Sequence, residues 1–99
     1  MVERILLFKL NDSSKREEVA SLTLRALSAL RTLEELSVGL PADEASAKSW
    51  DLSVVMGFAT EDDLEAALES PFFHSYLQRD MEGRYEVLKA WSFVRVEHV

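Results

Sequence analysis

The sequence predicts an α+β domain in which four strands and two helices follow the order β-α-β-β-α-β. Three observations predict this class. Four segments have the β-branched and aromatic content of strands, and two segments place apolar residues at helical spacing. Capping residues stand before both helical segments. The length of 99 residues fits one domain, residues 1–99.

The first half of the chain contains two strands and one helix. The segment 2–10 is predicted to be a strand, and Ser14 with Glu17 forms a capping box that starts a helix running to about Arg31. The segment 33–40 is the second strand, which Gly39 and Pro41 close. The residues that follow, 42–49, are small and polar and indicate a solvent-exposed loop.

The second half repeats the pattern in the order strand, helix, strand. The segment 50–59 is the third strand, and Thr60 with Asp63 caps the second helix. Ser70 and Pro71 restart that helix, because serine is a good N-cap and proline fits the first helical position. Gly83 can end the second piece, and the segment 85–99 is predicted to be a long last strand. This element order is the ferredoxin-like plan, with both helices on one face of a four-stranded antiparallel sheet.

The strands carry more apolar residues than two short helices can cover. Along the third strand Trp50, Leu52 and Val54 share one face, while Asp51 and Val55 share the other. Apolar residues also fall on both faces of the first strand, so the pattern leaves open which face meets the helices. Monomers seldom expose a large apolar patch, and the simplest cover is the same face of a second copy. We therefore expect a homodimer that packs sheet to sheet.

Charge and composition exclude several classes of function. The net charge of −7 argues against nucleic acid and against an anionic membrane surface. No apolar run is long enough to span a membrane, and no N-terminal segment has the pattern of a signal peptide. The absence of cysteine is compatible with a reducing cytoplasm, which is where we expect the protein. Two histidines form no metal motif, and we expect neither a metal nor a cofactor.

Four stretches resemble the stress-responsive dimeric α/β-barrel (Dabb) family across nearly the whole chain. They are "ILLFKL", "LSVG", "WDLSVVMGF" and "TEDDLEAALESPFFHSYL". The resemblance implies two ferredoxin-like subunits that pack sheet to sheet and close a barrel. The family includes plant stress proteins, bacterial proteins of unassigned role and a plant polyketide cyclase. Related dimeric barrels include cofactor-free monooxygenases, so the fold alone does not determine function.

The cyclase-like members carry histidines and a tyrosine that this chain lacks at the matching positions. Those members have a histidine early in the first strand, another in the third strand, and a His-Pro-x-His pattern at the start of the last helical piece. A tyrosine precedes that pattern by three residues. The matching positions in this chain are Arg4, about Leu52, Ala67, Ser70 and Phe73. Cyclase chemistry of that type is therefore not expected from these residues.

One histidine remains as a candidate base. His74 follows the Ser70 cap by four residues, and the positive end of the helix dipole favours a neutral imidazole there. One helical step of about 100° separates His74 from Phe73, the position that matches the enzymes. His74 is therefore either a base in a pocket or a structural side chain on a helix.

Six further residues are candidates for binding a ligand. Arg4 and Asp51 lie in strands among apolar residues, where a charge needs a partner or a ligand. They could bind an anion or a carbonyl, or form a salt bridge. The aromatic candidates for lining an apolar cavity, or for packing in the core, are Trp50, Phe58 and Trp91, and Tyr76 could steer a carbonyl.

Two functions are therefore compared below. The first is a non-catalytic or stress-related dimeric barrel that binds a small apolar molecule. The second is a cofactor-free enzyme, cyclase-like or monooxygenase-like, that uses His74 as a base on an aromatic or polyketide-like substrate. The first is preferred because the histidines of the enzyme members are missing.

Overall fold

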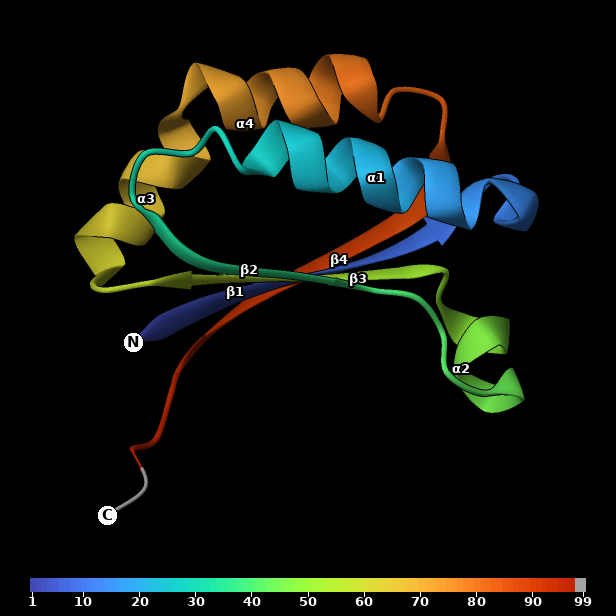
Figure 1. The fold of residues 1–99 in the computed structure, drawn as a ribbon, viewed down its shortest axis with the longest axis horizontal. Helices are drawn as coiled ribbons and strands as arrows, with labels where there is room; N and C mark the ends of the chain where they lie inside the picture. Colours follow the sequence, from blue (N-terminus) through green and yellow to red (C-terminus); the bar gives the residue numbers. More distant parts are fainter. Residues whose placement is uncertain (98–99) are drawn as a thin grey trace.

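One four-stranded antiparallel sheet forms the centre of the protein in the computed structural model, which describes residues 1–97 (Figure 1). The strands lie in the order β2-β3-β1-β4, so the first and third strands are central and the second and fourth form the edges. Their bounds are β1 Val2–Leu10, β2 Leu33–Gly39, β3 Leu52–Phe58 and β4 Tyr85–Val94. This arrangement confirms the predicted ferredoxin-like fold.

The helices lie mainly on one side of this sheet. Figure 1 shows α1, α3 and α4 above the sheet, while α2 and the segment after β4 lie on the opposite side. Their bounds are η1 Ser13–Lys15, α1 Arg16–Leu27, α2 Glu44–Ser49, α3 Glu61–Glu69 and α4 Pro71–Ser75, followed by a π-helical turn, η2 Tyr76–Asp80. The face without the larger helices is called the outer face below.

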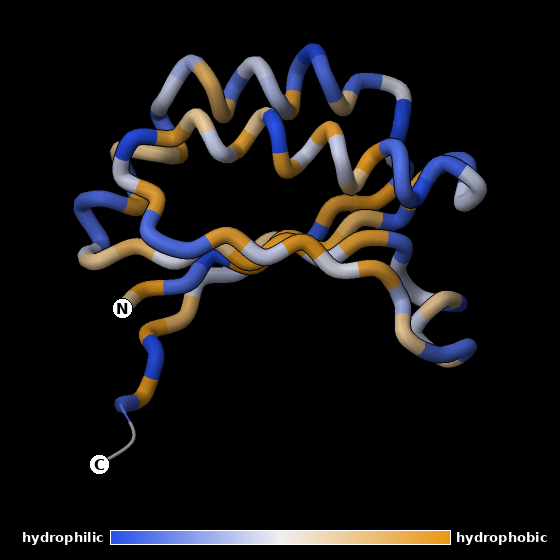
Figure 2. The backbone as a smooth tube through the Cα atoms, in the orientation of Figure 1, coloured by the Kyte–Doolittle hydropathy of each residue, from blue (hydrophilic) through white to orange (hydrophobic). Residues whose placement is uncertain are grey.

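Strand register decides which residues meet the helices. Leu6 lies opposite Val54 in β3, and both are fully buried between the sheet and the helices. Their neighbours in sequence point the other way, since successive residues of a strand alternate between faces. Figure 2 shows hydrophobic residues along the strands of the sheet. The outer face still carries apolar residues, namely Ile5, Leu7, Val55, Val87, Trp91 and Phe93.

The first helix starts later and ends earlier than the sequence pattern predicts. The side chain of Asp12, rather than Ser14, accepts a hydrogen bond from a backbone N–H, that of Ser14 at 3.0 Å, and opens the short turn η1. The α-helix itself ends at Leu27. The backbone N–H of Leu30 bonds to the carbonyl of Leu27, which tightens the chain into a turn before β2.

The prediction of a loop at residues 42–49 is wrong, because Glu44–Ser49 forms the helix α2. The Asp43 carboxylate accepts a hydrogen bond of 2.7 Å from the backbone N–H of Ser46, which is an N-cap. Alanines inside the segment favour the helix. Trp50 ends α2 and precedes β3, so the strand alternation does not include it.

The last strand is shorter than predicted. It ends at Val94, whereas the predicted strand ran to residue 99, and the final two positions lie outside the described residues. Gly83 has a φ of 72° in the turn before β4, which agrees with its predicted role at the end of the helical segment. Within residues 1–97, no helix is long and apolar enough to cross a membrane.

Candidate functional site

The side chain of His74 lies on the surface of α4. The residue is exposed, and it forms no side-chain hydrogen bond among those found in the described part of the chain. Its neighbour Phe73 takes the inward position and is buried. An exposed imidazole without a cavity has no substrate to act on as a general base. His74 does not line any of the hollows described below, and its role as a base stays a prediction.

Three of the five positions that match the enzyme residues of the family lie together between the sheet and the helices. Leu52, Ala67 and Phe73 are all buried in the same apolar core. None of these three side chains can transfer a proton. The space in which the enzyme members place polar groups is therefore filled by apolar packing in this protein.

Tyr76 is buried in this core beside Thr23 of α1. The two hydroxyl oxygens are 2.7 Å apart and share a hydrogen bond. The ring also packs edge-on against Phe8 of β1, with 6.4 Å between ring centroids. Burial raises the pKa of Tyr76 to about 12, although the hydrogen bond to Thr23 lowers it. The phenol is therefore neutral near pH 7 and is held by its own chain. Phe58 is fully buried in the same core.

Arg4 lies on the helix-covered face of β1, opposite Ser92 of β4. Its Nη1 donates a hydrogen bond of 3.0 Å to the Ser92 hydroxyl. Its Nε is buried and has no hydrogen-bond partner among the described residues. Ser92 also borders a hollow of about 160 Å³ between α3 and the end of β4, with Leu64 and Val94 in its walls. Arg4 is thus a donor near an opening, and its role with a ligand stays a prediction.

Asp51 does not lie near Arg4, and its partners belong to its own end of the sheet. Its carboxylate is fully buried and accepts a hydrogen bond from the backbone N–H of Leu10 at 2.8 Å. It also pairs with Arg16, whose Nε is 2.8 Å and Nη2 2.7 Å from Oδ1. Lys9 adds a third, longer contact at 3.7 Å. These contacts tie the start of β3 to the end of β1 and the start of α1.

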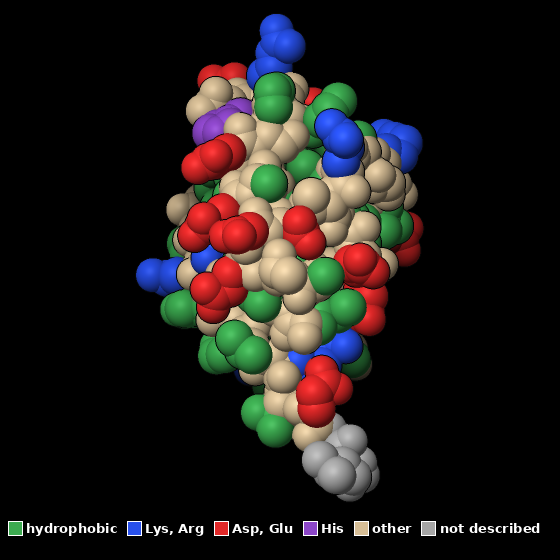
Figure 3. Space-filling model, turned by 90° about the vertical axis from the view of Figure 1, so that its left-hand side faces the viewer, with side chains coloured by type: hydrophobic (Ala, Val, Ile, Leu, Met, Phe, Trp, Pro, Cys, Tyr) green, Lys and Arg blue, Asp and Glu red, His purple; other side chains and the backbone are tan. Residues whose placement is uncertain are grey.

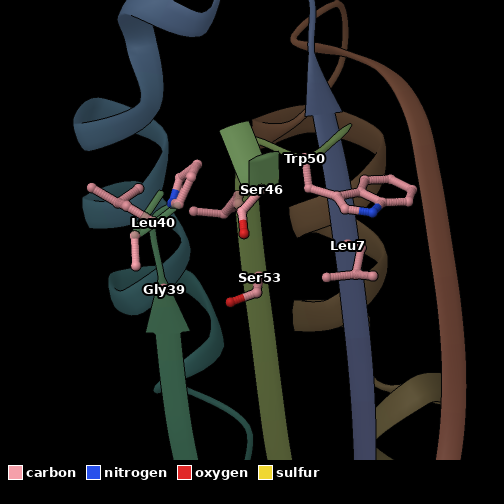
Figure 4. Close-up of a pocket in the computed structure, with 9 residues that line it drawn as sticks. Leu7, Gly39, Leu40, Ser46, Trp50 and Ser53 are labelled. Carbon is pink, nitrogen blue, oxygen red and sulfur yellow. The ribbon is translucent and has the colours of Figure 1, made fainter. Parts of the chain in front are cut away.

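A hollow of about 240 Å³ lies on the outer face beside α2. Figure 4 shows Gly39 and Leu40 on one side of it, Trp50 and Leu7 on the other, and Ser53 between them. Its lining is mostly apolar, with the hydroxyl groups of two serines as polar contacts. The residues that define this Trp50 hollow are Leu7, Leu40, Pro41, Ser46, Trp50 and Ser53.

Exposed apolar side chains lie on the same face as the Trp50 hollow, towards the opposite edge of the sheet. Trp91 is 47% exposed, Phe93 is 55% exposed and Val87 is 37% exposed, all on edge strand β4. At the other end of the face, Arg95 Nη2 contacts Glu3 Oε2 at 3.0 Å and Glu35 Oε2 at 2.9 Å. The salt bridges to Arg95 lower the pKa of the Glu35 carboxyl. The outer face is therefore an apolar surface with a fixed ionic cluster at one end.

A second surface hollow, of about 520 Å³, lies where α3 meets α4. Phe72 and Pro71 supply its apolar wall, and Thr32 and Arg31 supply polar groups. The hydroxyl of Thr32 already donates a 2.7 Å hydrogen bond to the carbonyl of Asp63. Larger volume alone does not make this the better site, because the Thr32 hydroxyl is already paired within the chain.

Sequence reasoning placed Trp50 and Trp91 among the ligand-binding candidates but missed the other walls of the hollow. Leu40 and Pro41 stand at the predicted end of the second strand, and Ser46 belongs to the segment 42–49 that is predicted to be a solvent-exposed loop. The signal that could have found them is the spacing of Asp43 and Ser46, which is typical of a helix cap. The predicted candidates thus fall into separate groups, and the structure does not assemble them into one site.

A family model that matches almost the entire chain shows which family the protein belongs to. The model of the stress-responsive A/B barrel domain (Dabb) matches residues 2–95. This chain belongs to the Dabb family. No protein of curated function matches its sequence.

Solved structures agree with this Dabb fold at low sequence identity. A Dabb family protein with a ferredoxin-like fold from Mesorhizobium loti has a TM-score of 0.81 at 13% identity, covering 97% of each chain. A dimeric ferredoxin-like protein of unknown function from Thermobifida fusca has a TM-score of 0.77 at 23% identity, covering 95% of this chain and 90% of that one.

An enzyme has the same fold. A cofactor-independent oxygenase from Streptomyces nogalater has a TM-score of 0.74 at 12% identity, covering 99% of this chain and 95% of the other. Since proteins of unknown function and an oxygenase share this fold, similarity of fold does not choose between the two functions.

Proposed function

We propose that this Dabb protein is a non-catalytic homodimer that binds a small apolar molecule in the Trp50 hollow. The observation that carries the proposal is the exposed apolar surface of the outer face, above all Trp91 and Phe93. Such a surface on a protein of 99 residues marks an interaction site. A role in a stress response, which the family description suggests, and a place in the cytoplasm belong to the same proposal.

The occupant of the outer face is a second copy of this chain. Four strands at about 4.8 Å spacing and about 25 Å length give a projected area of about 500 Å². The uneven surface of the side chains adds to this projected area, and so do α2 and the segment after β4. The total approaches the roughly 800 Å² per partner of a standard protein interface. The similar protein from Thermobifida fusca is dimeric, which supports a dimer here.

Light scattering after size-exclusion chromatography tests the dimer. We expect a mass of about 22 kDa, which is twice the chain mass of 11.2 kDa. Trp91→Asp places a charge on the outer face and should give a monomer. Phe72→Asp is the matched control, since Phe72 is 54% exposed on the helix side and the dimer should survive. A wild-type mass of 11 kDa at micromolar concentration would refute the dimer.

The ligand has to fit the size and polarity of the Trp50 hollow. A cavity of about 150 Å³ holds a benzene molecule, so about 240 Å³ suits a two-ring aromatic compound. The hydroxyl groups of Ser46 and Ser53 favour a compound with one hydrogen-bonding group. We therefore choose 2-naphthol as the probe.

Nuclear magnetic resonance can report binding of 2-naphthol at Trp50. The chain has two tryptophans, and Trp91→Phe identifies which indole N–H resonance belongs to Trp50. We expect 2-naphthol to shift that resonance. Ser53→Leu fills the hollow and should abolish the shift, whereas Ser37→Leu adds the same bulk elsewhere on the outer face and should not. A Trp50 resonance that stays fixed at saturating probe would count against this binding site.

The geometry gives less support to the cofactor-free enzyme. That function needs a base within hydrogen-bond reach of a substrate, and His74 is exposed on α4. The buried hydroxyl of Tyr76 is already paired with Thr23. The non-catalytic function is therefore the better conclusion from the residues that are present.

A further inference from the structure

We infer that the segment after β4 closes the Trp50 hollow of the partner subunit, so that each ligand site is built by two chains. This segment, residues 95–97, is called the C-terminal arm. The inference rests on the proposed dimer and goes beyond it, because it assigns a residue of one subunit, Val96, to the binding site of the other.

The arm leaves the body of the protein on the outer side of the sheet. Figure 1 shows the chain after β4 on the side opposite to α1 and α4, and Figure 3 shows it projecting below the body. Val96 is 92% exposed and Val94 is 65% exposed. Val94 ends β4, so Val96 is the apolar side chain of the arm; its exposure to water is unfavourable, and a partner that covers it would stabilise the arm.

The root of the arm is fixed in direction. The backbone N–H of Arg95 donates a 2.9 Å hydrogen bond to the carbonyl of Met1. The Arg95 guanidinium contacts Glu3 and Glu35 on the outer face of the same chain. The first arm residue is thus held by its own subunit, while the side chain of the next residue, Val96, is 92% exposed.

The arm has the length that the contact requires. An extended chain advances about 3.3 Å per residue, so three residues span about 10 Å. Packed sheets also lie about 10 Å apart. A chain that leaves one sheet at residue 95 therefore reaches the surface of the facing sheet by about residue 97.

The positions of the arm and the hollow satisfy two-fold symmetry. The arm leaves from edge strand β4, next to the start of β1, since Val94 pairs with Val2. The Trp50 hollow lies beside the other edge, near the end of β1, and includes Leu7. These are opposite corners of the outer face. We place the two-fold axis between the two facing sheets, along the diagonal that joins the other two corners of the outer face. Rotation about this axis brings the arm corner of one subunit over the hollow corner of the other, so each arm meets the partner's hollow.

The contact is also chemically matched. The hollow offers Leu7, Leu40 and Trp50 to the isopropyl group of Val96. Glu97, which follows Val96, already lies 3.8 Å from the N-terminal amine of its own chain, so the match rests on the apolar contact of Val96. A valine at the opening covers the ligand without filling the space. The site then takes small apolar molecules only when the dimer is formed, and binding stabilises the dimer by mass action.

Engineered cysteines can test this contact, because the chain contains no cysteine of its own. The double variant Ser46→Cys/Val96→Cys should form a disulfide between subunits under mild oxidation and run as a dimer on a non-reducing gel. A disulfide within one subunit is excluded, since it requires Cα atoms about 4.4–6.8 Å apart and the two corners are separated by more than about 15 Å. Glu17→Cys/Val96→Cys is the control, because Glu17 lies on the helix side in α1.

The outcomes separate the inference from the proposed function. The arm contact is supported if Ser46→Cys/Val96→Cys forms a disulfide between subunits and Glu17→Cys/Val96→Cys does not. A folded dimer in which the Ser46 pair does not cross-link overturns the arm contact and leaves the dimer standing. Equal cross-linking by the single variant Val96→Cys also overturns it, because the arms would then meet each other. A monomeric wild-type protein overturns both.

A binding measurement checks the role of the arm without a cross-link. Val96→Asp places a charge at the opening and should weaken 2-naphthol binding at least tenfold, while light scattering still reports a dimer. Val96→Leu keeps an apolar cover and should retain affinity within about threefold. Equal affinity of the aspartate variant and the wild type, both dimeric, would show that the arm is not part of the site.

Discussion

Asp51 offers the sharpest test of how the outer face is held in place. Its carboxylate is fully buried and joins β1, β3 and α1 through Leu10 and Arg16. Removing it as Asp51→Ala leaves the N–H of Leu10 without a partner, which costs about 1–3 kcal/mol. It also releases Arg16, whose side chain is 29% exposed and can be partly rehydrated. The pair to Arg16 therefore contributes at the lower end of about 1.5–3 kcal/mol.

The expected loss for Asp51→Ala is about 3 kcal/mol in the free energy of unfolding. Urea unfolding followed by circular dichroism, at a fixed protein concentration, measures it. The midpoint should fall by about 1.5 M if the slope is about 2 kcal/mol per M. Asp51→Asn keeps an acceptor for Leu10 and should lose about half as much.

A double-mutant cycle separates the ion pair from the rest of the loss. Arg16→Ala, Asp51→Ala and the double variant should give a coupling energy of about 1–2 kcal/mol. A loss below 1 kcal/mol for Asp51→Ala, or additive single losses, would refute the structural role. A folded Asp51→Ala dimer that no longer binds 2-naphthol would instead favour the predicted role in the ligand site.

Three further predictions concern the helix side of the protein and the turn before β4. Because burial raises the pKa of Tyr76 to about 12, its contribution to stability is complete below pH 10 and falls as pH rises towards 12. Urea unfolding should show that the free energy of unfolding falls by roughly 2–3 kcal/mol over this pH range in the wild type and does not fall in Tyr76→Phe. The same fall in Tyr76→Phe as in the wild type would contradict the prediction. His74→Ala should change the free energy of unfolding by less than about 0.5 kcal/mol and leave 2-naphthol binding unchanged. A loss of 2-naphthol binding in titrations would show that His74 belongs to the ligand site. Gly83→Ala should cost about 1 kcal/mol in thermal unfolding because Gly83 has a φ of 72°, and equal melting temperatures would argue against the turn.

Local patterns were enough to predict the order of the elements and part of the core. The strand at residues 2–10 matches the prediction at both ends, and Phe73 and Tyr76, three residues apart, both lie inward as helical spacing requires. The same periodicity turns His74 outward, one helical step from Phe73. The helix α2 was missed because its six residues bury no side chain and leave no apolar stripe to detect.

The location of the candidate site was harder to predict because it depends on contacts between distant segments. The predicted third strand begins at Trp50 and therefore places Trp50 on the same face as Leu52, whereas β3 begins at Leu52 and Trp50 ends α2. In the structure Trp50 instead lines the hollow with Leu7, from a strand more than forty residues earlier in the chain. The π-helical turn after Ser75 also has no pattern that distinguishes it from an α-helix.

The two faces of the sheet explain why a family with enzyme members can contain a protein of this kind. On the helix side, Phe73 and Leu52 occupy positions where enzyme members place histidines, and the space is packed. On the outer face, Trp91 and Phe93 stay exposed, and a packed core cannot account for them. An apolar sheet face that was needed only for stability would have been covered by the chain's own helices. Its exposure, beside a hollow and a projecting arm, is therefore explained best by a second subunit that completes both the fold and the site.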